Sequence, residues 1–511
     1  MSFEYSTKNI PTATKTSYLK RFIDKTELFL KRMRWKAFFF LNGNTEGTGC
    51  ENYGFKSNKF PPAINELKEF DGKMTNLIRN TEFGNKNNDF QQKLTRDLKA
   101  VKTQNKLMIK ADKTINYYKM DQQNYTELVN TNLTKTYKKT TQSEVATINK
   151  EAKQIAESIN LSDHVELLAQ KEAFITLKDH KPNFDNKPTC RLINPTKSEI
   201  GQVSKIILER IVRNTVCSTG INLWKSTRDV LTWNRNCHTN QKSSFINIDI
   251  IDFYPSITES LLLKAINHAK QYTEILDNEI DIIIHAKRTL VFNGGEPRKK
   301  KGNDSGFDVT MGSLDGAETC ELVVCYILSL LQQTYGKSIG RYRDDGLGIS
   351  TLSAKQTEKA KQHICKVFSD NGLRITIEVN KKVLNFLDVT LDLKTGQYKP
   401  YMKPNNKLQY INVHSNHRPS ILRSIPQSIN KRLSGISSCK EAFYKAAPTY
   451  QQALDESGFG FKLHYEDPQP EKRSRKRNII WFNPPYDLGV KTNIGKELLK
   501  IITKCFPPPP Q

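Results

Sequence analysis

The amino-acid sequence predicts an α+β protein that folds as several domains or subdomains. Its 511 residues exceed what one compact core usually holds. Near the N-terminus, apolar residues recur at helical spacing, as in Tyr18, Leu19 and Phe22. The centre instead contains short runs rich in β-branched and aromatic residues, which are typical of strands. The chain carries 24 Phe and 19 Tyr spread over its length, and this distribution excludes wholesale disorder.

Helices and strands can be assigned in chain order from these patterns. Residues 1–105 are expected to form a basic helical extension, because basic residues separate apolar ones at helical spacing. A solvated helix pair and a specific RNA-binding role are both compatible with this extension. The next helix is expected at 144–159, and strands are expected at 107–109, 173–177, 191–193 and 245–251.

Three polar stretches interrupt these elements and are typical of linkers or surface insertions. Residues 42–57 are rich in Gly, Asn and Thr, residues 293–306 are basic, and residues 466–478 form a basic run that contains Pro. These stretches suggest a division into an N-terminal extension, a central region and a C-terminal region, with bounds at 1–105, 106–395 and 396–511.

The charge balance indicates a polyanionic partner. Lys and Arg number 79 against 53 Asp and Glu, so the formal net charge is +26, spread along the chain. Each phosphate that Lys or Arg neutralises releases condensed counterions, which makes nucleic acid the first expectation and an anionic membrane surface the second. The sequence contains no run of about 18 apolar residues and does not open as a signal peptide does. We therefore expect an intracellular protein that does not bind membranes.

Two aspartate motifs form the sharpest chemical signal. Asp344 and Asp345 follow Tyr342 and Arg343 between apolar residues, as in the tight turn of a β-hairpin, and Asp249 closes an earlier apolar strand. Metal-dependent phosphoryl transfer uses two divalent ions held by hard oxygen ligands on rigid neighbouring elements. A strand ending in one aspartate beside a hairpin carrying two more would supply such ligands. Simple turn formation by the pair and helix capping by Asp249 are the alternatives.

These motifs resemble the palm motifs of reverse transcriptases, with 249–254 as the first and 342–345 as the third. The resemblance covers roughly residues 106–505 and is nearest to the polymerases of Penelope-like retroelements. Further motifs of that family are matched in order at 110–113 (KADK), 178–182 (KDHKP), 311–313 (MGS), 386–388 (FLD) and 403–404 (KP). The resemblance implies a right-hand fold, with fingers and an antiparallel palm sheet in 106–395. It implies a helical thumb and a basic C-terminal region in 396–511.

The resemblance also implies an activity, RNA-directed DNA polymerisation by a retroelement enzyme. Nucleotides would pass from dNTPs to the 3′-hydroxyl of a DNA primer paired to an RNA template. Asp249 and Asp344 would ligate two Mg²⁺ ions, for which Mn²⁺ can substitute, and Asp345 would be a weaker ligand beside them. Tyr254 would be the steric gate, because its ring would leave no room for a 2′-hydroxyl. An ordinary core tyrosine is the alternative.

Further substrate-binding residues follow from the same resemblance. Arg191, Lys178 and Lys181 would belong to finger strands that close on the incoming triphosphate. A guanidinium contacts phosphate oxygens in pairs, whereas lysines act as point charges. Gly312 and Ser313 would let the backbone approach the template and the nascent base pair ahead of a long helix.

Three other segments bear on these expectations. Residues 314–318 (LDGAE) replace the Ser-Pro that commonly follows such a glycine, which leaves the template contacts there open. Residues 386–389 are expected to form a half-buried strand, and the resemblance makes this segment the primer-grip hairpin before the thumb. The cationic run 472–477, followed by Trp481 and Phe482, is compatible with base stacking, with nuclear import and with a solvated charge run. Nuclear location is the expectation we adopt.

Two other classes of protein stay open. A metal-dependent nuclease or an RNA polymerase can also use three aspartates, although Tyr254 disfavours ribonucleotides and the strand-to-hairpin spacing disfavours most nucleases. A domesticated or inactive reverse-transcriptase-like nucleic-acid-binding protein is the second alternative, and the intact Asp249, Asp344 and Asp345 weigh against it. Most Penelope-like elements carry a GIY-YIG endonuclease, and neither tripeptide occurs here. An endonuclease-lacking lineage and a truncated reading frame both explain that difference.

Overall fold

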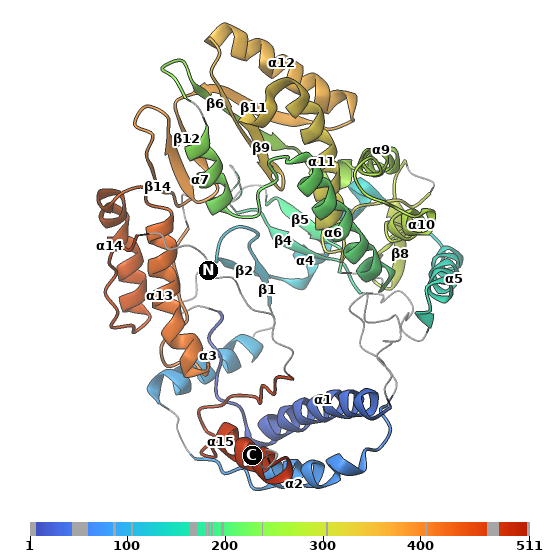
Figure 1. The fold of residues 1–511 in the computed structure, drawn as a ribbon, viewed down its shortest axis with the longest axis vertical. Helices are drawn as coiled ribbons and strands as arrows, with labels where there is room; N and C mark the ends of the chain where they lie inside the picture. The colour runs from blue at the N-terminus through green and yellow to red at the C-terminus, as the bar shows by residue number, and fades with distance from the viewer. Residues whose placement is uncertain are drawn as a thin grey trace.

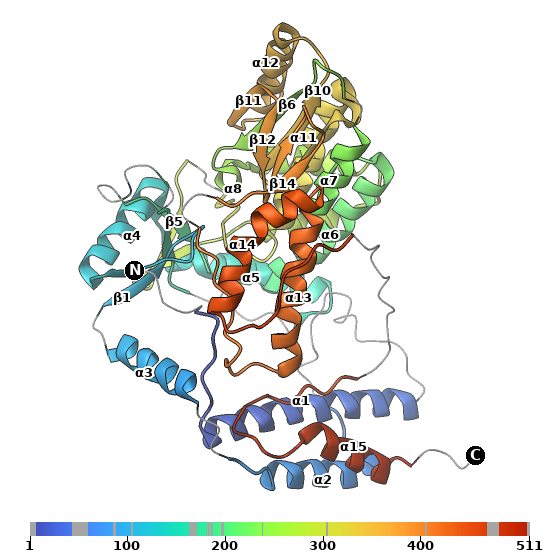
Figure 2. The same cartoon turned by 90° about the vertical axis from the view of Figure 1, so that its left-hand side faces the viewer.

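Helices and strands are mixed along the computed structural model, which confirms the α+β composition expected from the sequence. A sheet covered by helices occupies one end of the molecule, and a layer of three helices occupies the other (Figures 1 and 2). Among the residues that the structure describes, no helix is long and apolar enough to cross a lipid bilayer. The described residues are 7–42, 60–84, 88–103, 106–162, 171–179, 181, 184, 188–195, 199–237, 239–302, 305–403, 406–467 and 480–507.

The largest sheet has antiparallel strands in the spatial order β11-β6-β10-β9. These strands are β6 (Ser244–Ile250), β9 (Ile339–Tyr342), β10 (Asp345–Ser350) and β11 (Ile375–Lys381). The strand predicted at 245–251 is thus confirmed. Because side chains alternate along a strand, Ile246, Ile248 and Ile250 of β6 enter one core and Phe245 enters another. The sheet is therefore buried on both faces.

A group of helices covers the face to which Ile246, Ile248 and Ile250 point. These helices are α6 (Glu199–Thr219), α9 (Glu259–Ala269), α10 (Asp277–His285), α11 (Gly316–Tyr335) and α12 (Ala354–Asp370). Their buried apolar side chains and the three isoleucines form the main core of the protein. Burial of one Leu, Ile or Val side chain stabilises a fold by about 1.5–3 kcal/mol. This core therefore gives the sheet a rigid support.

The opposite face packs against α7 (Thr227–Asn236) and a smaller sheet. Its strands are β12 (Val383–Phe386), β13 (Val389–Asp392) and β14 (Tyr398–Pro400), in antiparallel order. The strand expected at 386–389 is wrong in part, because Phe386 pairs with Val389 across a two-residue turn. Leu387 adopts a φ of 53° in this turn, a left-handed conformation that ends the strand.

Shorter sheets and two further helices are formed by residues 107–193 and 291–300. They are β1 (Leu107–Lys110) with β2 (Tyr117–Met120), β4 (Phe174–Leu177) with β5 (Cys190–Ile193), β3 (Tyr137–Lys139) with β8 (Glu296–Lys300) and β7 (Val291–Asn293), and helices α4 (Gln122–Thr136) and α5 (Gln142–Ser158). The strands predicted at 107–109, 173–177 and 191–193, and the helix predicted at 144–159, are confirmed. The linker expected at 293–306 is wrong in part, because β8 pairs there with both β7 and β3.

The two ends of the chain share one helical layer, shown at the bottom of Figures 1 and 2. Its helices are α1 (Lys15–Leu41), α2 (Lys68–Arg79) and α15 (Ile494–Cys505). Phe22 and Phe70 of the first two helices form an aromatic core with Phe29 and with Phe482 from the C-terminal part, and the Phe29 and Phe482 ring centroids lie 4.7 Å apart. The helices expected within residues 1–105 are present, whereas the division into 1–105, 106–395 and 396–511 stays a prediction.

A buried polar cluster fastens this layer to the rest of the protein. Asn416 donates to the Asp487 carboxylate at 2.8 Å, and its own N–H donates to the Ile10 carbonyl at 2.9 Å. Gln91 donates to the His414 carbonyl at 2.7 Å. The cluster thereby joins both chain ends to α3 (Asp89–Thr103) and to the segment that leads into α13 (Pro419–Gly435) and α14 (Lys440–Glu456).

Two predicted segments lie outside the described residues. These are the linker at 42–57, apart from Asn42, and the basic stretch at 466–478, apart from Glu466 and Asp467. The second segment includes the cationic run at 472–477. Trp481 and Phe482, which follow that run, are described: Trp481 is exposed, whereas Phe482 packs in the aromatic core of the terminal layer. Of this aromatic pair, Trp481 alone therefore presents most of its ring to solvent.

Candidate active site

The aspartates that the sequence singles out meet at one end of the main sheet. Asp345 of β10 lies directly opposite Asp249 of β6 in the strand register. Residues opposite one another in antiparallel strands have Cα atoms about 4.5–5.5 Å apart, with side chains on the same face. That face is the one on which Phe245 and Leu347 are buried further along the same two strands. Asp249 itself is exposed and Asp345 is half-buried.

Asp344 joins this pair through a tight turn. Asp345 pairs with Tyr342, so Arg343 and Asp344 form a two-residue hairpin turn, which confirms the predicted hairpin. Arg343 has a φ of 53°, a left-handed conformation that costs a non-glycine residue about 1–2 kcal/mol. The Ile250 N–H donates to the Asp344 carbonyl at 3.4 Å, which ties the turn to the end of β6. The structure therefore brings all three aspartates together.

The helix-capping alternative for Asp249 is wrong. The short helix α8 (Phe253–Ser256) follows β6, and the residue at its N-cap position is Asp252, not Asp249. Asp252 has a φ of 48° and makes no side-chain capping hydrogen bond. The Asp249 carboxylate is consequently available for another role at the end of the strand.

The three carboxylates repel one another. Burial, and then the charges of Asp344 and Asp249, raise the pKa of Asp345 to about 6. Burial and the charge of Asp344 also raise the pKa of Asp249. Within the described part of the chain, none of the three carboxylates forms an ion pair. A bound cation would relieve this repulsion.

The donor set fits a divalent cation that substrates help to hold. Among the described residues, no group of three or more His, Cys, Asp or Glu side chains forms a ready-made metal site. Mg²⁺ is usually bound through one or two carboxylates, several waters and substrate phosphates, and seldom by a cage made of protein ligands alone. Hard carboxylate oxygens from Asp249, Asp344 and Asp345, converging at one sheet end, match that mode of binding.

A buried arginine lies behind the carboxylates, and sequence reasoning missed it. Arg341 of β9 has no exposed surface, and its guanidinium lies over the Phe368 ring of α12, 5.4 Å from the ring centre. One of its N–H groups donates to the Asp344 carbonyl. Burial lowers the pKa of Arg341 to about 10, whereas the three aspartates raise it. A sequence pattern gives no signal for this burial, because arginine is normally a surface residue.

Tyr254 lies against the beginning of α11. Its ring is half-buried, and a side chain at Gly316 would come within 3.2 Å of Tyr254 Cε1. Burial, followed by the charges of Cys320 and Asp344, raises the pKa of Tyr254 to about 12. Tyr254 therefore lies between the carboxylates and the first turn of the long helix.

Gly312 and Ser313 precede α11, as the sequence predicts. Gly312 has a φ of 114°, and a Cβ there would lie 2.3 Å from the Asn194 carbonyl oxygen, so only glycine fits. The Ser313 hydroxyl donates to the Thr310 carbonyl at 3.0 Å. The loop is thus packed against the segment that follows β5, the strand that carries Arg191.

Arg191 and the two predicted lysines lie at the ends of β4 and β5. The Arg191 guanidinium donates to the Asp112 carboxylate at 2.9 Å. Lys178 is half-buried and Lys181 is exposed, and the positive charge of Lys181 lowers the pKa of Asp249. His180 lies outside the described residues, as do positions 182 and 183.

Two more lysines contribute positive charge to the site. Lys113 lowers the pKa of Asp249, and Lys403 lowers the pKa of Asp345. Both lysines belong to motifs matched in the sequence, at 110–113 and 403–404. Their position in the KADK and KP motifs is the sequence signal that could have identified Lys113 and Lys403 as site residues. Together with Lys181 they give the carboxylates a cationic surrounding that suits a polyphosphate.

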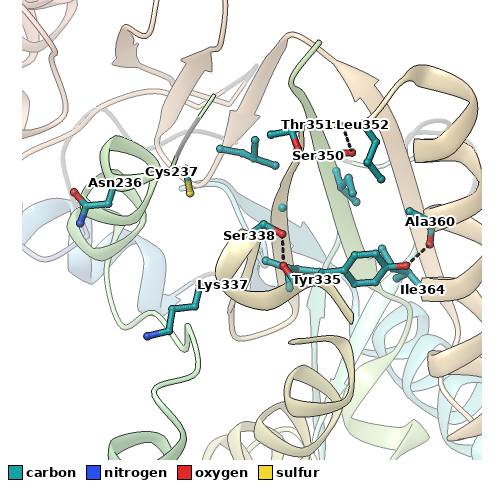
Figure 3. Close-up of a pocket in the computed structure, with 14 residues that line it drawn as sticks. Asn236, Cys237, Tyr335, Lys337, Ser338, Ser350, Thr351, Leu352, Ala360 and Ile364 are labelled. Atoms are coloured by element: carbon teal, nitrogen blue, oxygen red, sulfur yellow. Dashed lines mark hydrogen bonds between the residues drawn. The ribbon is translucent and has the colours of Figure 1, made fainter. Parts of the chain in front are cut away.

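A cavity with a volume of about 420 Å³ lies at the opposite end of β10 (Figure 3). Ile246, Ile339, Ile349 and Ile364 form apolar parts of its lining. Figure 3 shows Tyr335 beside it, and the hydroxyl of this residue donates to the Ala360 carbonyl at 3.2 Å. The lining includes none of the three aspartates, so this cavity is separate from the candidate active site.

Comparison with known proteins gives similarity at the level of structure. No protein-family description matches the sequence, and neither does any curated protein. A telomerase from Candida albicans, in complex with the TWJ fragment of telomeric RNA, is 11% identical and aligns with a TM-score of 0.50 over 78% of this chain and 70% of that chain.

Two further solved structures are similar with lower scores. An apo telomerase from Candida tropicalis is 11% identical, with a TM-score of 0.44 over 87% of this chain and 84% of that chain. The RNA-dependent RNA polymerase of a human picobirnavirus is 8% identical, with a TM-score of 0.39 over 77% of this chain and 87% of that chain. The alignment with the Candida albicans enzyme shows that this chain shares the fold of a telomerase.

Proposed function

We propose that the protein is a reverse transcriptase, which copies an RNA template into DNA by adding nucleotides from dNTPs to a primer 3′-hydroxyl. The observation that carries this proposal is the register that sets Asp249 opposite Asp345, beside the turn that holds Asp344. Its occurrence in a fold shared with a telomerase supports a polymerase over an unrelated nuclease. The Candida albicans telomerase was solved with RNA, which agrees with an RNA template for this chain.

In the proposed reaction, the carboxylates of Asp249, Asp344 and Asp345 hold Mg²⁺, or Mn²⁺ in its place. The bound ions supply charge neutralisation at the triphosphate and activation of the primer hydroxyl. The protein contributes a preformed arrangement, because the main core holds β6 and β10 rigidly before substrates bind. Burial, followed by repulsion among the carboxylates, raises the pKa values of Asp249 and Asp345, and a bound cation would offset both effects.

Tyr254 is the proposed steric gate for the sugar. Its half-buried ring is backed by the start of α11, where Gly316 leaves no side chain between helix and ring. A ring supported in this way cannot retreat from a 2′-hydroxyl. Deoxynucleotides are therefore the proposed substrates, which agrees with DNA synthesis and disfavours the RNA polymerase alternative.

Arg191, Lys178 and Lys181 are the proposed contacts to the incoming triphosphate. Lys181 follows β4 and is exposed, and its positive charge lowers the pKa of Asp249, which supports a role near the triphosphate. The Arg191 guanidinium forms an ion pair with Asp112. In the proposed complex it would donate to a phosphate, either in place of Asp112 or together with it. Gly312 and Ser313 are proposed to lie along the template and the nascent base pair.

The proposed right-hand arrangement follows from these roles. The main sheet with its helices would be the palm, the short sheets around β4 and β5 the fingers, and α13 with α14 the thumb. The Penelope-like motifs at 110–113, 178–182 and 386–388 make a retroelement the proposed source of the enzyme. A retroelement enzyme works on chromosomal DNA, so a nuclear location is part of the proposal.

Primer extension tests this function directly. The purified full-length chain is incubated with poly(rA)/oligo(dT), dTTP and Mg²⁺, with a poly(dA) template and an EDTA reaction alongside. Extension on the RNA template that EDTA abolishes is the expected result. Tight binding of the primer–template without any extension, in Mg²⁺ and in Mn²⁺, would instead identify an inactive nucleic-acid-binding protein.

A further inference from the structure

A lysine and an aspartate form a fully buried ion pair next to the proposed nucleotide site. Lys287 follows α10, and its ammonium donates to the carboxylate of Asp315, immediately before α11. The side chains are 1% and 0% exposed, respectively. Ser204 of α6 donates to the same carboxylate at 2.5 Å. The pair therefore fastens the beginning of α11 to two other segments of the core.

Stability alone does not account for this arrangement. Removing two charges from water costs several kcal/mol per ion, and replacing a buried pair by neutral side chains of similar size is often neutral or stabilising. Asp315 also does not serve as a side-chain cap for α11, although its carbonyl accepts the Thr319 N–H and hydroxyl. The ion pair instead fixes the position and direction of the first turn of α11.

That first turn is the surface on which Tyr254 lies. Gly316 comes directly after Asp315, and a Cβ there would meet Tyr254 Cε1 at 3.2 Å and Ser313 Oγ at 2.6 Å. Cys320 lies one turn further along α11. Burial raises the pKa of its thiol, and a hydrogen bond with the Tyr254 side chain lowers it. The Lys287 charge acts on the same thiol. Tyr254 thus rests on the turn that Lys287 and Asp315 hold in place.

The loop before this turn reaches the other side of the proposed site. The Asn194 N–H donates to the Met311 carbonyl at 3.1 Å, and Gly312 packs on the Asn194 carbonyl. Asn194 directly follows β5, which carries Arg191. A shift of the loop around Asp315 would therefore move both the support of Tyr254 and the end of β5.

We propose that Lys287 and Asp315 are positioning residues for sugar discrimination, because their ion pair holds the first turn of α11 against the Tyr254 ring. Neither residue touches the substrate in this account. The inference deepens the proposed function and rests on it. It also gives a reason for the departure from Ser-Pro at residues 314–318. The Asp315 side chain is buried in the core, where it supports the helix turn that contacts Tyr254.

A charge-free double variant separates positioning from stability. Lys287→Met with Asp315→Asn keeps both side-chain sizes and leaves no unpaired buried charge. The matched control is Arg210→Met with Glu279→Gln, which removes a 2.6 Å ion pair between α6 and α10 away from Tyr254. The measured quantities are kcat/KM for dTTP over UTP in primer extension, and hydrogen exchange of the amides at 315–320.

The expected result is that the double variant lowers dTTP preference about tenfold or more, which corresponds to about 1.4 kcal/mol. Exchange at 315–320 accelerates in this variant, and the control changes neither quantity. In a Tyr254→Ala background, the same double substitution adds no further loss of preference, because it acts through Tyr254. Unchanged preference, or a loss that adds to that of Tyr254→Ala, would overturn the proposal.

Hydrogen exchange distinguishes a failure of the proposed function from a failure of the positioning role. A wild-type chain that does not extend primers would refute the proposed function, whereas unaltered exchange at 315–320 in the double variant would refute the positioning role. If the double variant folds but loses extension with both nucleotides, accelerated exchange confined to 315–320 supports the role and unaltered exchange rejects it.

Discussion

Asp345, the first residue of β10, lies directly opposite Asp249 near the end of β6, with both side chains on the same face of the main sheet. Like charges directly opposite one another in a sheet are destabilising. No described cation forms an ion pair with either carboxylate, although Arg341, Lys113 and Lys403 act on them from a distance. The fold therefore retains an unfavourable arrangement of charges that a bound divalent cation would relieve.

Removal of the Asp345 charge should stabilise the metal-free protein in a pH-dependent way. The pKa of Asp345 is raised from 3.8 to about 6, so the folded state binds its proton more tightly than the unfolded state. Stability from this group is therefore present at low pH and is lost as the pH rises towards and through 6. We expect Asp345→Asn to increase stability at pH 8 by on the order of 1–3 kcal/mol.

Thermal melts in EDTA between pH 4 and pH 8 measure this effect. The gain from Asp345→Asn should be greatest above pH 6 and should fade towards pH 4, while the exposed Asp252→Asn should show no such trend. Saturating Mg²⁺ should also narrow the difference between wild type and Asp345→Asn at pH 8. A difference that stays constant across this pH range would contradict the assigned repulsion.

Tyr254→Ala should admit ribonucleotides. Loss of the ring that α11 supports opens the space for a 2′-hydroxyl, so the dTTP over UTP ratio of kcat/KM should fall by about tenfold or more. Tyr254→Phe keeps the ring and is the matched control, with a ratio within about twofold of wild type. Steady-state primer extension with each nucleotide gives both ratios, and equal ratios for wild type and Tyr254→Ala would remove the gate assignment.

Arg341→Lys should slow the chemical step more than it weakens nucleotide binding. The guanidinium donates to the Asp344 carbonyl and lies over the Phe368 ring, and lysine cannot reproduce this planar contact. We expect kcat to fall about tenfold with little change in KM. Arg374→Lys, on an exposed side chain next to Asp252, is the control and should retain full activity. An Arg341→Lys variant that matches wild type would show that the charge alone is sufficient.

Asp388→Ala should loosen the connection of the smaller sheet to α7 and α13. The Asp388 carboxylate accepts hydrogen bonds from Thr227 of α7 and from Arg432 of α13, the latter at 2.7 Å. Loss of both should lower stability by about 1–3 kcal/mol. It should also shorten the products made in one binding event, if α13 and α14 grip the primer–template. Asp392→Ala on the same hairpin is the control, and equal product lengths for both variants would speak against this role.

Sequence reasoning recovers those parts of the fold that local patterns determine. The strand β6 and the hairpin at Tyr342–Asp345 follow from alternation, apolar flanks and turn chemistry, and the structure has both. The hairpin β7–β8 was missed because β8 carries Glu, Pro, Arg and two Lys, and its pairing with β3 depends on a distant segment. The turn at Leu387 was missed because leucine rarely adopts a left-handed φ.

The candidate site likewise contains some residues that local sequence patterns predict and others that they do not. The grouping of Asp249, Asp344 and Asp345 could be predicted from their motifs, because a strand end and a tight turn leave local patterns in the sequence. Arg341 and Lys287 are not found, because no local pattern tells a buried cation from a solvated one. The association of Phe482 with the N-terminal helices is likewise invisible, since it joins opposite ends of the chain.

A comparison of dTMP incorporation by wild type and by Asp344→Asn, on poly(rA)/oligo(dT) with Mg²⁺, tests whether the three carboxylates support metal-dependent DNA synthesis. Both proteins are checked for equal folding and equal primer–template binding. We predict sustained incorporation by wild type and a loss of about a thousandfold or more in Asp344→Asn, because this substitution removes a charged metal ligand. Incorporation at equal rates by the two proteins would contradict the account.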